Sequence, residues 1–283
     1  MNSILKFSVI LGAISALSLT ACAPPKAVLK TSSQVLNELE AHYKIGKPSG
    51  AGPYPTIIYL HGASDNAWYD HPEKITATLN SAGYATIFVD SYAGRGISGT
   101  ALRSGTLLPA ERAADLLISL DWAGQQSWVK TDAIGVIGYS HGATTVMDAL
   151  VLAPPSRKPA GLIDTPSSGI SNLKAGVLFY PWCADDIMGI ELNKVFDEDW
   201  DVAVPLLGIL PGADKGSDAA LCSSIFSRHA DKGLPVSRLD LPGVGHTFDQ
   251  VNDDHGNPQP EYDPKATEKA YDATMAFFDK HLK

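Results

Sequence analysis

Short runs of apolar residues alternate with stretches of helical periodicity along most of the chain, from residue 34 to the C-terminus. Apolar runs bounded by Gly, Pro or Asp are typical of buried strands. Such runs occupy residues 56–60, 84–89, 134–137, 175–180, 204–210 and 236–241. Residues 39–45 instead alternate apolar and polar side chains, which predicts one further strand at an edge of the sheet.

Between these strands, apolar residues recur at the spacing of an amphipathic helix. Residues 109–125, 143–152 and 217–230 fit this pattern, and a C-terminal helix is expected after Asp263, a capping residue followed by proline. The alternation of strands and helices predicts an α/β fold with a mostly parallel sheet, in a single domain over residues 34–283.

One five-residue motif carries the strongest chemical signal. Gly138-Tyr139-Ser140-His141-Gly142 has the form G-x-S-x-G, follows the apolar run at 134–137 and precedes good helix formers. Strand, sharp turn and helix is the context of a nucleophile elbow, and the two glycines leave room for the tight turn. The motif therefore predicts Ser140 as a nucleophile.

A serine hydroxyl needs a base within hydrogen-bond reach, and that base needs a third group to fix its tautomer. His246 lies in a glycine-rich loop after the last predicted strand, and Asp214 ends the strand before it. In a parallel sheet the carboxyl ends of the strands meet at one edge. We therefore expect Ser140, Asp214 and His246 to form a triad, in the chain order of an α/β-hydrolase.

Other residues compete for these roles. Asp218 is the rival to Asp214, because it lies in the same loop. His141 is a rival base, although its side chain is expected to point away from Ser140. Asp249 is interpreted as a structural acceptor, and His61 as a residue that shapes a loop by hydrogen bonding. The remaining histidines are interpreted as surface residues: His42, His71, His229, His255 and His281.

Attack on a carbonyl produces an oxyanion that needs two backbone amides. One is expected from His141 and the other from the loop after Leu60-His61-Gly62, at Ala63. We find no dinucleotide fingerprint, no phosphate-binding loop and no metal-binding pair of histidines, so no cofactor and no metal are expected.

The N-terminus is typical of an exported lipoprotein. An apolar stretch at residues 9–19 runs into Leu19-Thr20-Ala21-Cys22, which resembles a bacterial lipobox. This resemblance implies a signal peptide over residues 1–21, lipidation of Cys22, a tether over residues 22–33 and attachment to the membrane, with the outer membrane favoured. The alternative is a plain secretory signal that is cut nearby.

Charge and cysteine content agree with an exported enzyme. The net charge of -9, with no run of Lys or Arg, excludes nucleic acid as an expected partner. With Cys22 lipidated, Cys183 and Cys222 remain as a pair, and an oxidising compartment favours a disulfide between them over two buried free thiols.

Taken together, the motifs resemble the dienelactone hydrolase family of α/β-hydrolases over residues 39–282. The resemblance rests on the nucleophile motif and on the segments Lys47-Pro48, Gly52-Pro53-Tyr54-Pro55, Leu60-His61-Gly62, Asp90-Ser91-Tyr92-Ala93-Gly94-Arg95-Gly96, Leu241-Pro242-Gly243 and His246-Thr247-Phe248-Asp249. Similar family members also carry Tyr-Pro-x-Cys and a second cysteine past the catalytic acid, which Tyr180-Pro181-Trp182-Cys183 and Cys222 match.

This chain departs from the family pattern at two places. The founding enzymes use a cysteine nucleophile where this chain has Ser140, and they hold a substrate carboxylate with two arginines. Arg95 matches the first arginine, with a loop residue tied to carbonyls as the alternative, and no second arginine follows His246. The acidic Asp249 would repel a carboxylate there. Dienelactone itself is therefore a doubtful substrate.

The sequence thus predicts a serine-dependent carboxylic ester hydrolase that acts on a small-molecule ester. Arg95, Trp68, Tyr69, Tyr92 and Trp182 are the candidate substrate-binding residues, with simple loop packing as the alternative for the aromatic ones. The long irregular stretches at 153–173 and 185–202 are expected to wall the cleft. The alternative functions are an amide-cleaving enzyme of the same fold and a non-catalytic binding lipoprotein.

Overall fold

The computed structural model of this 283-residue chain describes residues 29–154, 156–166, 169–187, 190–191, 195–196 and 204–283. The predicted signal peptide, Cys22 and residues 22–28 of the predicted tether lie outside the described residues. No helix within the described ranges has both the length and the apolar character needed to cross a membrane.

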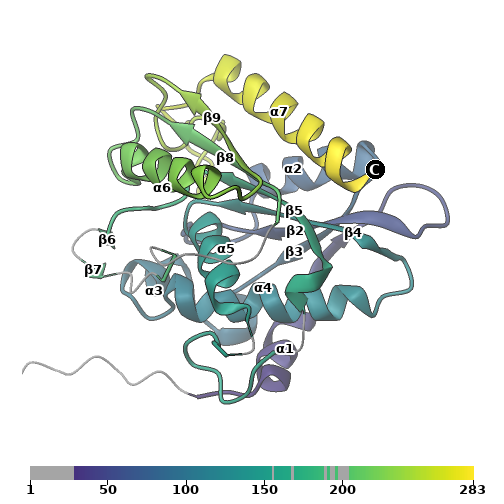
Figure 1. Ribbon diagram of the computed structural model, residues 1–283. Coiled ribbons are helices and arrows are strands. Elements are labelled where there is room, and N and C mark those ends of the chain that lie inside the picture. The colour runs from purple at the N-terminus through teal and green to yellow at the C-terminus, as the bar shows by residue number, and fades with distance from the viewer. Residues whose placement is uncertain (1–28, 155, 167–168, 188–189, 192–194, 197–203) are drawn as a thin grey trace, which may run out of the picture.

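A seven-stranded sheet forms the centre of the molecule, with strand order β1-β3-β2-β4-β5-β8-β9 (Figure 1). Only β1 runs antiparallel to its neighbour, and the other strands are parallel, as the alternation of strands and helices predicted. The strands are β1 (Lys44–Gly46), β2 (Tyr54–Leu60), β3 (Ala85–Val89), β4 (Val129–Tyr139), β5 (Leu173–Phe179), β8 (Leu206–Pro211) and β9 (Val236–Leu241).

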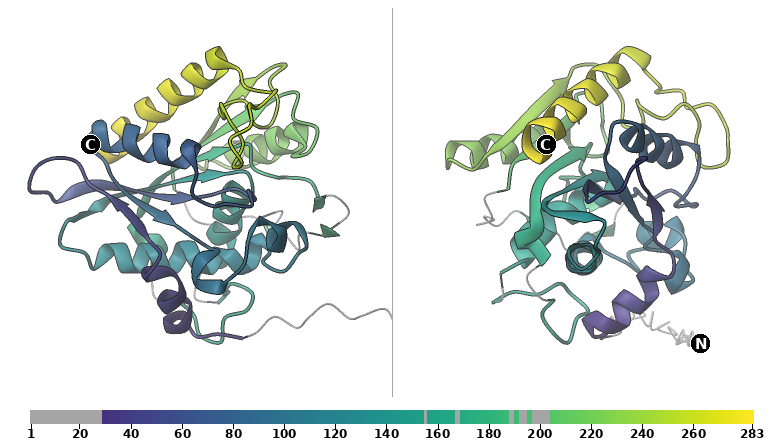
Figure 2. Two further views of the ribbon diagram at one scale, coloured as in Figure 1. Left: turned by 180° about the vertical axis from the view of Figure 1, so that it is seen from behind. Right: turned by 90° about the vertical axis from the view of Figure 1, so that its right-hand side faces the viewer.

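Helices cover both faces of this sheet. On one face lie α2 (Asp70–Ser81) and α7 (Pro264–Leu282), and on the other lie α4 (Pro109–Gly124) and α5 (His141–Leu152), with α1 (Ser32–Glu40) packed outside α4 (Figures 1 and 2). Apolar side chains fill each layer, because strands buried on both faces have no exposed side. The α/β-hydrolase architecture predicted from the sequence is confirmed.

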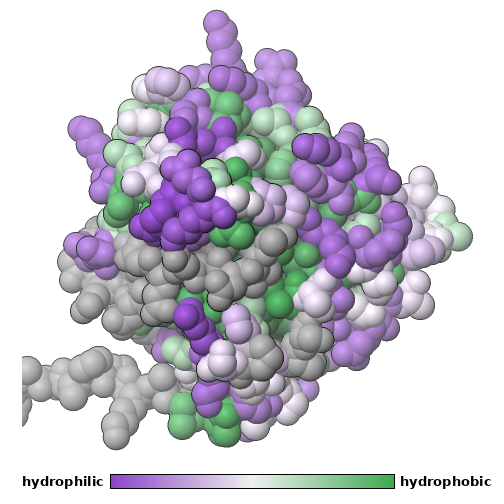
Figure 3. Space-filling view, in the orientation of Figure 1, coloured by the Kyte–Doolittle hydropathy of each residue, from purple (hydrophilic) through white to green (hydrophobic). Residues whose placement is uncertain are grey.

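Helix α6 (Ala219–Asp231) packs on the same face of the sheet as α4 and α5, where Ile225 and Phe226 join the same apolar core (Figure 1). Shorter elements complete the chain: η1 (Ala93–Arg95), α3 (Gly99–Arg103), η2 (Gly169–Asn172) and the strand pair β6 (Asp186–Ile187) and β7 (Ile190–Glu191). On the face shown in Figure 3, hydrophobic residues lie in small areas among hydrophilic ones, which agrees with a core that is buried between the sheet and its helices.

The strand predicted at 39–45 is wrong over its first half, because α1 extends to Glu40 and β1 begins only at Lys44. Thr31 starts that helix with a capping box: its hydroxyl accepts from the Gln34 amide, and the Gln34 side chain accepts from the Thr31 amide. Val35 and Leu39, four residues apart, then bury on one helical face. The helices α2 and α3 were not predicted.

Candidate active site

Ser140 lies at the sharp turn between β4 and α5, with φ 50° and ψ −118°. A positive φ is costly for a residue with a side chain, so the surrounding packing has to hold it. A Cβ added at Gly142 would lie 2.3 Å from the Leu60 carbonyl oxygen, and one at Gly138 would lie 2.8 Å from the Cα of Ala143. The strand–turn–helix predicted around Ser140 is therefore present, and its glycines are required by close backbone contacts.

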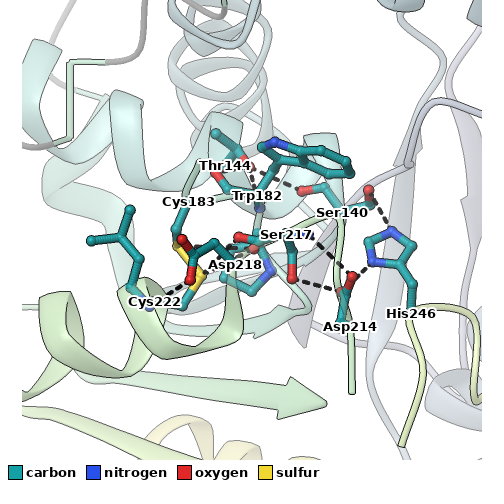
Figure 4. The surroundings of a disulfide bond; sticks show 11 residues. Ser140, Thr144, Trp182, Cys183, Asp214, Ser217, Asp218, Cys222 and His246 are labelled. Atoms are coloured by element: carbon teal, nitrogen blue, oxygen red, sulfur yellow. Dashed lines mark hydrogen bonds and ion pairs between the residues drawn. A yellow bond between two sulfur atoms is a disulfide. The ribbon is translucent and has the colours of Figure 1, made fainter. Parts of the chain in front are cut away.

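His246 joins Ser140 to Asp214 across the end of the sheet. Its Nε2 atom lies 3.0 Å from Ser140 Oγ, and its Nδ1 atom lies 2.5 Å from Asp214 Oδ2 (Figure 4). Ser140 follows β4, Asp214 follows β8 and His246 follows β9, so three strand ends bring the groups together. This geometry suits a serine that loses its proton to an imidazole oriented by a carboxylate.

The Asp214 carboxylate is almost fully buried and accepts four hydrogen bonds. Besides His246, Ser217 Oγ donates at 2.6 Å, and the amides of Gly216 and Ser217 donate at 3.1 Å. Burial alone would raise the pKa of Asp214, but the hydrogen bonds and the charge of His246 hold it below its ordinary value. The group is therefore a carboxylate at neutral pH, as the partner of an imidazolium must be.

A disulfide lies behind the Asp214 loop. Cys183 and Cys222 are bonded with their Cα atoms 5.3 Å apart, which confirms the predicted pairing. The Cys183 amide donates to the Ser217 carbonyl at 2.9 Å, and the neighbouring Trp182 amide donates to Thr144 Oγ1 at 2.8 Å (Figure 4). Thr144 is one turn beyond Ser140 on α5, so this segment connects the serine helix with the Asp214 loop.

The rival residues have other contacts. Asp218 caps α6 by accepting from the Leu221 amide. His141 is buried, with Nδ1 3.3 Å from the Arg112 guanidinium. Asp249 is buried and accepts from three side chains. Its donors are Tyr180 Oη at 2.9 Å, Tyr271 Oη at 3.1 Å and His71 Nε2 at 3.0 Å.

Two of the histidines predicted at the surface are instead buried, and the prediction is wrong for them. His71 packs in the polar cluster with Asp249, and His229 Nδ1 donates to the Ile225 carbonyl at 2.8 Å, one turn earlier in α6. Each histidine lies on the inner face of its helix. The sequence pattern did not assign these two positions to the core, because histidine is intermediate between the residue types that are usually buried and those that are usually exposed.

The two predicted oxyanion donors lie on either side of Ser140. His141 is the first residue of α5, where a helix leaves its amides without an internal acceptor. Ala63 lines the cavity next to Ser140, and a Cβ added at the preceding Gly62 would lie 3.5 Å from Ser140 Cβ. The prediction that these two amides stabilise an oxyanion therefore rests on their places in the chain beside Ser140.

His61 shapes this loop, as predicted. The Ser91 amide donates to His61 Nε2 at 3.2 Å, so Nδ1 carries the proton and donates to the Gly62 carbonyl at 2.8 Å. Burial and the nearby Arg112 charge lower the pKa of His61 well below its ordinary value, in agreement with this neutral tautomer.

A cavity of about 230 Å³ opens at Ser140. Its aromatic walls come from Tyr59, Tyr69, Tyr139, Tyr180 and Trp182, and its polar ones include His71, Arg103, Gln250, Asp253 and Asp254. None of the lining residues belongs to the described parts of 153–173 or 185–202, so the predicted walls are wrong for those parts, and the rest of both stretches lies outside the described residues. The segments 59–72 and 246–259 take that place and are tied together by hydrogen bonds, such as Asn66 N to Asp254 at 2.9 Å (Figure 2).

Of the predicted substrate-binding residues, only Tyr69 and Trp182 line this cavity. Arg95 donates two hydrogen bonds to Asp115, at 2.6 and 2.9 Å, and one to the Ser91 carbonyl. Trp68 packs edge-on against Phe88, with ring centroids 4.7 Å apart. Tyr92 is buried and donates to the Gly62 carbonyl. Arg95, Trp68 and Tyr92 are therefore structural in this position, which corrects the prediction.

Sequence reasoning missed several residues around the site. Ser217 was not singled out, although a hydroxyl three residues after the acid is well placed to donate to it. Arg112 was overlooked as well, although a charge among the buried positions of a helix was a visible signal. Asp65, Asp254 and His255 offer three possible ligand atoms within 4.8 Å of one another, but the group is largely exposed and Asp65 pairs with Arg103.

Comparisons with known proteins agree with this architecture. The model of the X-Pro dipeptidyl-peptidase (S15) family matches residues 40–180, and that of the dienelactone hydrolase family matches residues 162–282. A relative from Methylorubrum extorquens, provisionally named a carboxymethylenebutenolidase, is 20% identical over 242 residues, covering 83% of this chain and 75% of its own length.

Two solved structures share the fold. The esterase Est2 of Thermogutta terrifontis with bound propionate has a TM-score of 0.64 and 18% identity, with coverage of 90% of this chain and 94% of its own. A Klebsiella pneumoniae protein, provisionally described as a dienelactone hydrolase, has a TM-score of 0.65 and 16% identity, with coverage of 84% and 92%. At these identities the structural likeness establishes the fold.

Proposed function

We propose that the chain is a serine-dependent carboxylic ester hydrolase of the dienelactone hydrolase family, whose model matches residues 162–282. The observation that carries this proposal is the hydrogen-bonded line from Ser140 through His246 to Asp214. A non-catalytic binding protein would have no need of this line.

The proposed reaction proceeds through an acyl-enzyme. Ser140 Oγ attacks the ester carbon while His246 takes its proton, and the amides of His141 and Ala63 stabilise the oxyanion. The tetrahedral intermediate then expels the alcohol, which receives the proton from His246. A water molecule repeats the sequence on the acyl-enzyme, with His246 as base, and the acid is released. Asp214 stabilises the imidazolium in both halves.

The charges around the cavity favour a neutral ester over dienelactone, whose carboxylate the founding enzymes of the family hold with two arginines. Arg95 is engaged with Asp115, and Arg103, which does line the cavity, donates to the Ala63 carbonyl and to Asp65. Asp253 and Asp254 lie at the same cavity. An anionic substrate would therefore meet negative charge without a free cation among the described lining residues.

An amide substrate is the second candidate, because the X-Pro dipeptidyl-peptidase model matches residues 40–180. We propose to compare p-nitrophenyl esters of graded acyl length with peptide p-nitroanilides on the protein without its first 22 residues. Ester turnover should dominate. A fluorophosphonate should label the wild type and leave Ser140→Ala unlabelled. Folded wild-type protein that is neither labelled nor active would contradict the proposal and favour a binding protein.

The proposed location is the bacterial cell envelope, through a lipid on Cys22. The support is the segment Leu19-Thr20-Ala21-Cys22 after an apolar stretch. In cells fed a labelled fatty acid, the wild-type protein should take up label and partition into membranes. Cys22→Ser should lose both properties, and label retained by this variant would argue against lipidation at Cys22.

A further inference from the structure

Arg112 is a fully buried arginine on the inner face of α4, beneath the loops that surround Ser140. Its Nε atom donates to Ser91 Oγ at 2.8 Å. Its Nη1 atom donates to the His61 carbonyl at 2.7 Å and contacts His141 Nδ1 at 3.3 Å. One guanidinium nitrogen therefore contacts two segments that are far apart in the sequence.

Those two segments are the ones that carry the proposed oxyanion donors. His61 stands two residues before Ala63, and His141 directly follows Ser140. They also touch each other, because a Cβ added at Gly142 would lie 2.7 Å from the His61 carbonyl oxygen. The geometry of the oxyanion site thus depends on how these segments are held together at the place where Arg112 binds both.

Burial of this guanidinium is not explained by an ion pair. Within the described residues no carboxylate forms a direct ion pair with Arg112. Asp115 is linked to it through Ser91 Oγ, which accepts from Arg112 and donates to Asp115, and the Asp115 carboxylate itself pairs with Arg95. Arg112 Nη2 is buried without a hydrogen-bond partner. A buried cation without a paired anion is costly, so a purely structural role would be served as well by an apolar side chain.

We propose that Arg112 is a positioning residue for the oxyanion site, holding the His61 carbonyl and the His141 ring so that the amides of Ala63 and His141 converge beside Ser140. The inference rests on the proposed function for its kinetic consequence. Burial and the Arg112 charge keep the pKa of His141 well below its ordinary value, so that the ring stays neutral and accepts from the guanidinium.

Arg95 provides a matched control. It is also a largely buried arginine. It donates to the Ser91 carbonyl and pairs with Asp115, to which Arg112 is linked through Ser91 Oγ. Its hydrogen bonds, however, do not reach His61 or His141. Arg112→Lys keeps the charge but loses the planar set of donors, and Arg95→Lys makes the same change next to it.

The first measurement is hydrogen exchange of backbone amides by mass spectrometry on the full, folded protein. In Arg112→Lys, peptides that cover 60–66 and 139–145 should exchange faster by about tenfold or more, while peptides of α7 keep their wild-type rates. Arg95→Lys should leave both segments unchanged. If Arg112→Lys does not fold, Arg112→Gln, which retains an amide donor, takes its place in the same comparison.

The second measurement separates oxyanion stabilisation from general damage. Active sites are counted with a fluorophosphonate, and kcat and KM for a p-nitrophenyl ester are expressed per counted site. We expect Arg112→Lys to lower kcat by about ten- to a hundredfold with little change in KM, because a displaced donor acts mainly in the transition state. Ser140 Oγ adds to the carbonyl carbon of a trifluoromethyl ketone, and the resulting oxyanion stays in the site. The affinity of this ketone for Arg112→Lys should be lower than for the wild type by the same factor as kcat.

Wild-type exchange in both segments of Arg112→Lys, or equal loosening in Arg95→Lys, would overturn the inference. The inference would also be overturned if kcat falls in Arg112→Lys while the affinity for the trifluoromethyl ketone stays at the wild-type value. If the wild type itself neither hydrolyses esters nor reacts with the fluorophosphonate, the proposed function fails, whereas the exchange measurement still decides whether Arg112 holds these two segments.

Discussion

Asp214, Asp218 and Asp249 lie within one stretch of the chain and differ only in what surrounds them. Asp214 accepts from His246, Asp218 caps α6, and Asp249 receives three donors from His71, Tyr180 and Tyr271. The same carboxylate group thus orients a ring, starts a helix or holds a buried polar cluster. The contacts of each carboxylate, more than its presence, decide its role.

The first prediction concerns Asp214 and Asp218. Asp214→Asn keeps the shape of the side chain but removes the charge that stabilises the imidazolium and fixes its tautomer. We expect kcat for a p-nitrophenyl ester to fall by about 10³- to 10⁴-fold. Asp218→Asn should retain near wild-type kcat, because asparagine also caps a helix. Equal losses in the two variants would show that the loop, rather than the Asp214 charge, is what matters.

At this scale the sequence predicted contacts that follow from chain order and missed those that depend on side-chain direction. Ser140, Asp214 and His246 meet because each stands just past a strand end, which sequence patterning reveals. Arg95 and Tyr92 also follow a strand end, yet both turn toward the protein interior. Residue spacing locates the edge of the sheet, but the direction of a side chain is set by partners such as Asp115.

At the scale of elements, buried strands were the most predictable part of the fold, because strands that are buried on both faces of a parallel sheet consist of continuous runs of apolar residues. Around Leu39 the prediction was wrong, since alternation and helical periodicity overlap in so short a segment and the capping box at Thr31 decided in favour of a helix. The residues of α2 were not recognised as helical. Its inner face is interrupted by His71, whose partner Asp249 is distant in the sequence.

The turn between β4 and α5 gives the second prediction. In Gly142→Ala the new methyl group would lie 2.3 Å from the Leu60 carbonyl oxygen, so the backbone must shift. We expect the free energy of unfolding to fall by about 1–3 kcal/mol. Gly62→Ala is the comparison, because its methyl group would meet Ser140 Cβ at an ordinary 3.5 Å. Denaturant unfolding should rank the two variants in this order, and the reverse ranking would contradict the packing argument.

The disulfide between Cys183 and α6 gives the third prediction. Removing a link across 39 residues, with both cysteines changed to serine, should lower stability by about 4 kcal/mol or less in the chain-entropy model. Because the Cys183 amide holds the Ser217 carbonyl, and Ser217 holds Asp214, kcat should fall as well, by less than in Asp214→Asn. Thermal unfolding and ester hydrolysis well below the melting temperature test the two effects.

Reduction of the wild type with a thiol should reproduce both changes, which controls for the serine substitutions. A lower melting temperature with unchanged kcat would mean that Asp214 is held by its own loop and does not depend on the cross-link.

At the scale of the whole molecule, the parallel sheet brings segments from across the chain to one edge. The cavity is bounded by residues 59–72, from the end of β2 onward, and by residues 246–259 after β9, two segments that meet through tertiary contacts. Sequence patterning predicted the edge on which the site lies. It assigned the walls to the two longest irregular stretches, because length is visible in a sequence and the pairing of loops is not.

The last prediction follows from the charge of the molecule and its distribution at the cavity. The chain carries a net charge of -9, and Asp253 and Asp254 line the cavity while the Arg103 guanidinium is bound by Asp65 and the Ala63 carbonyl. An ester with a carboxylate on its acyl chain should therefore be hydrolysed with a kcat/KM about three- to tenfold below that of a neutral ester of equal length, and the gap should narrow as salt screens the charges. In the double variant Asp253→Asn/Asp254→Asn, kcat/KM for the anionic ester at low salt should rise toward the value for the neutral ester. The kcat/KM for the neutral ester should not rise to the same extent. A preference for the anionic ester in the wild type would show that the cavity offers a cation to the carboxylate, with Arg103 as the residue to change next.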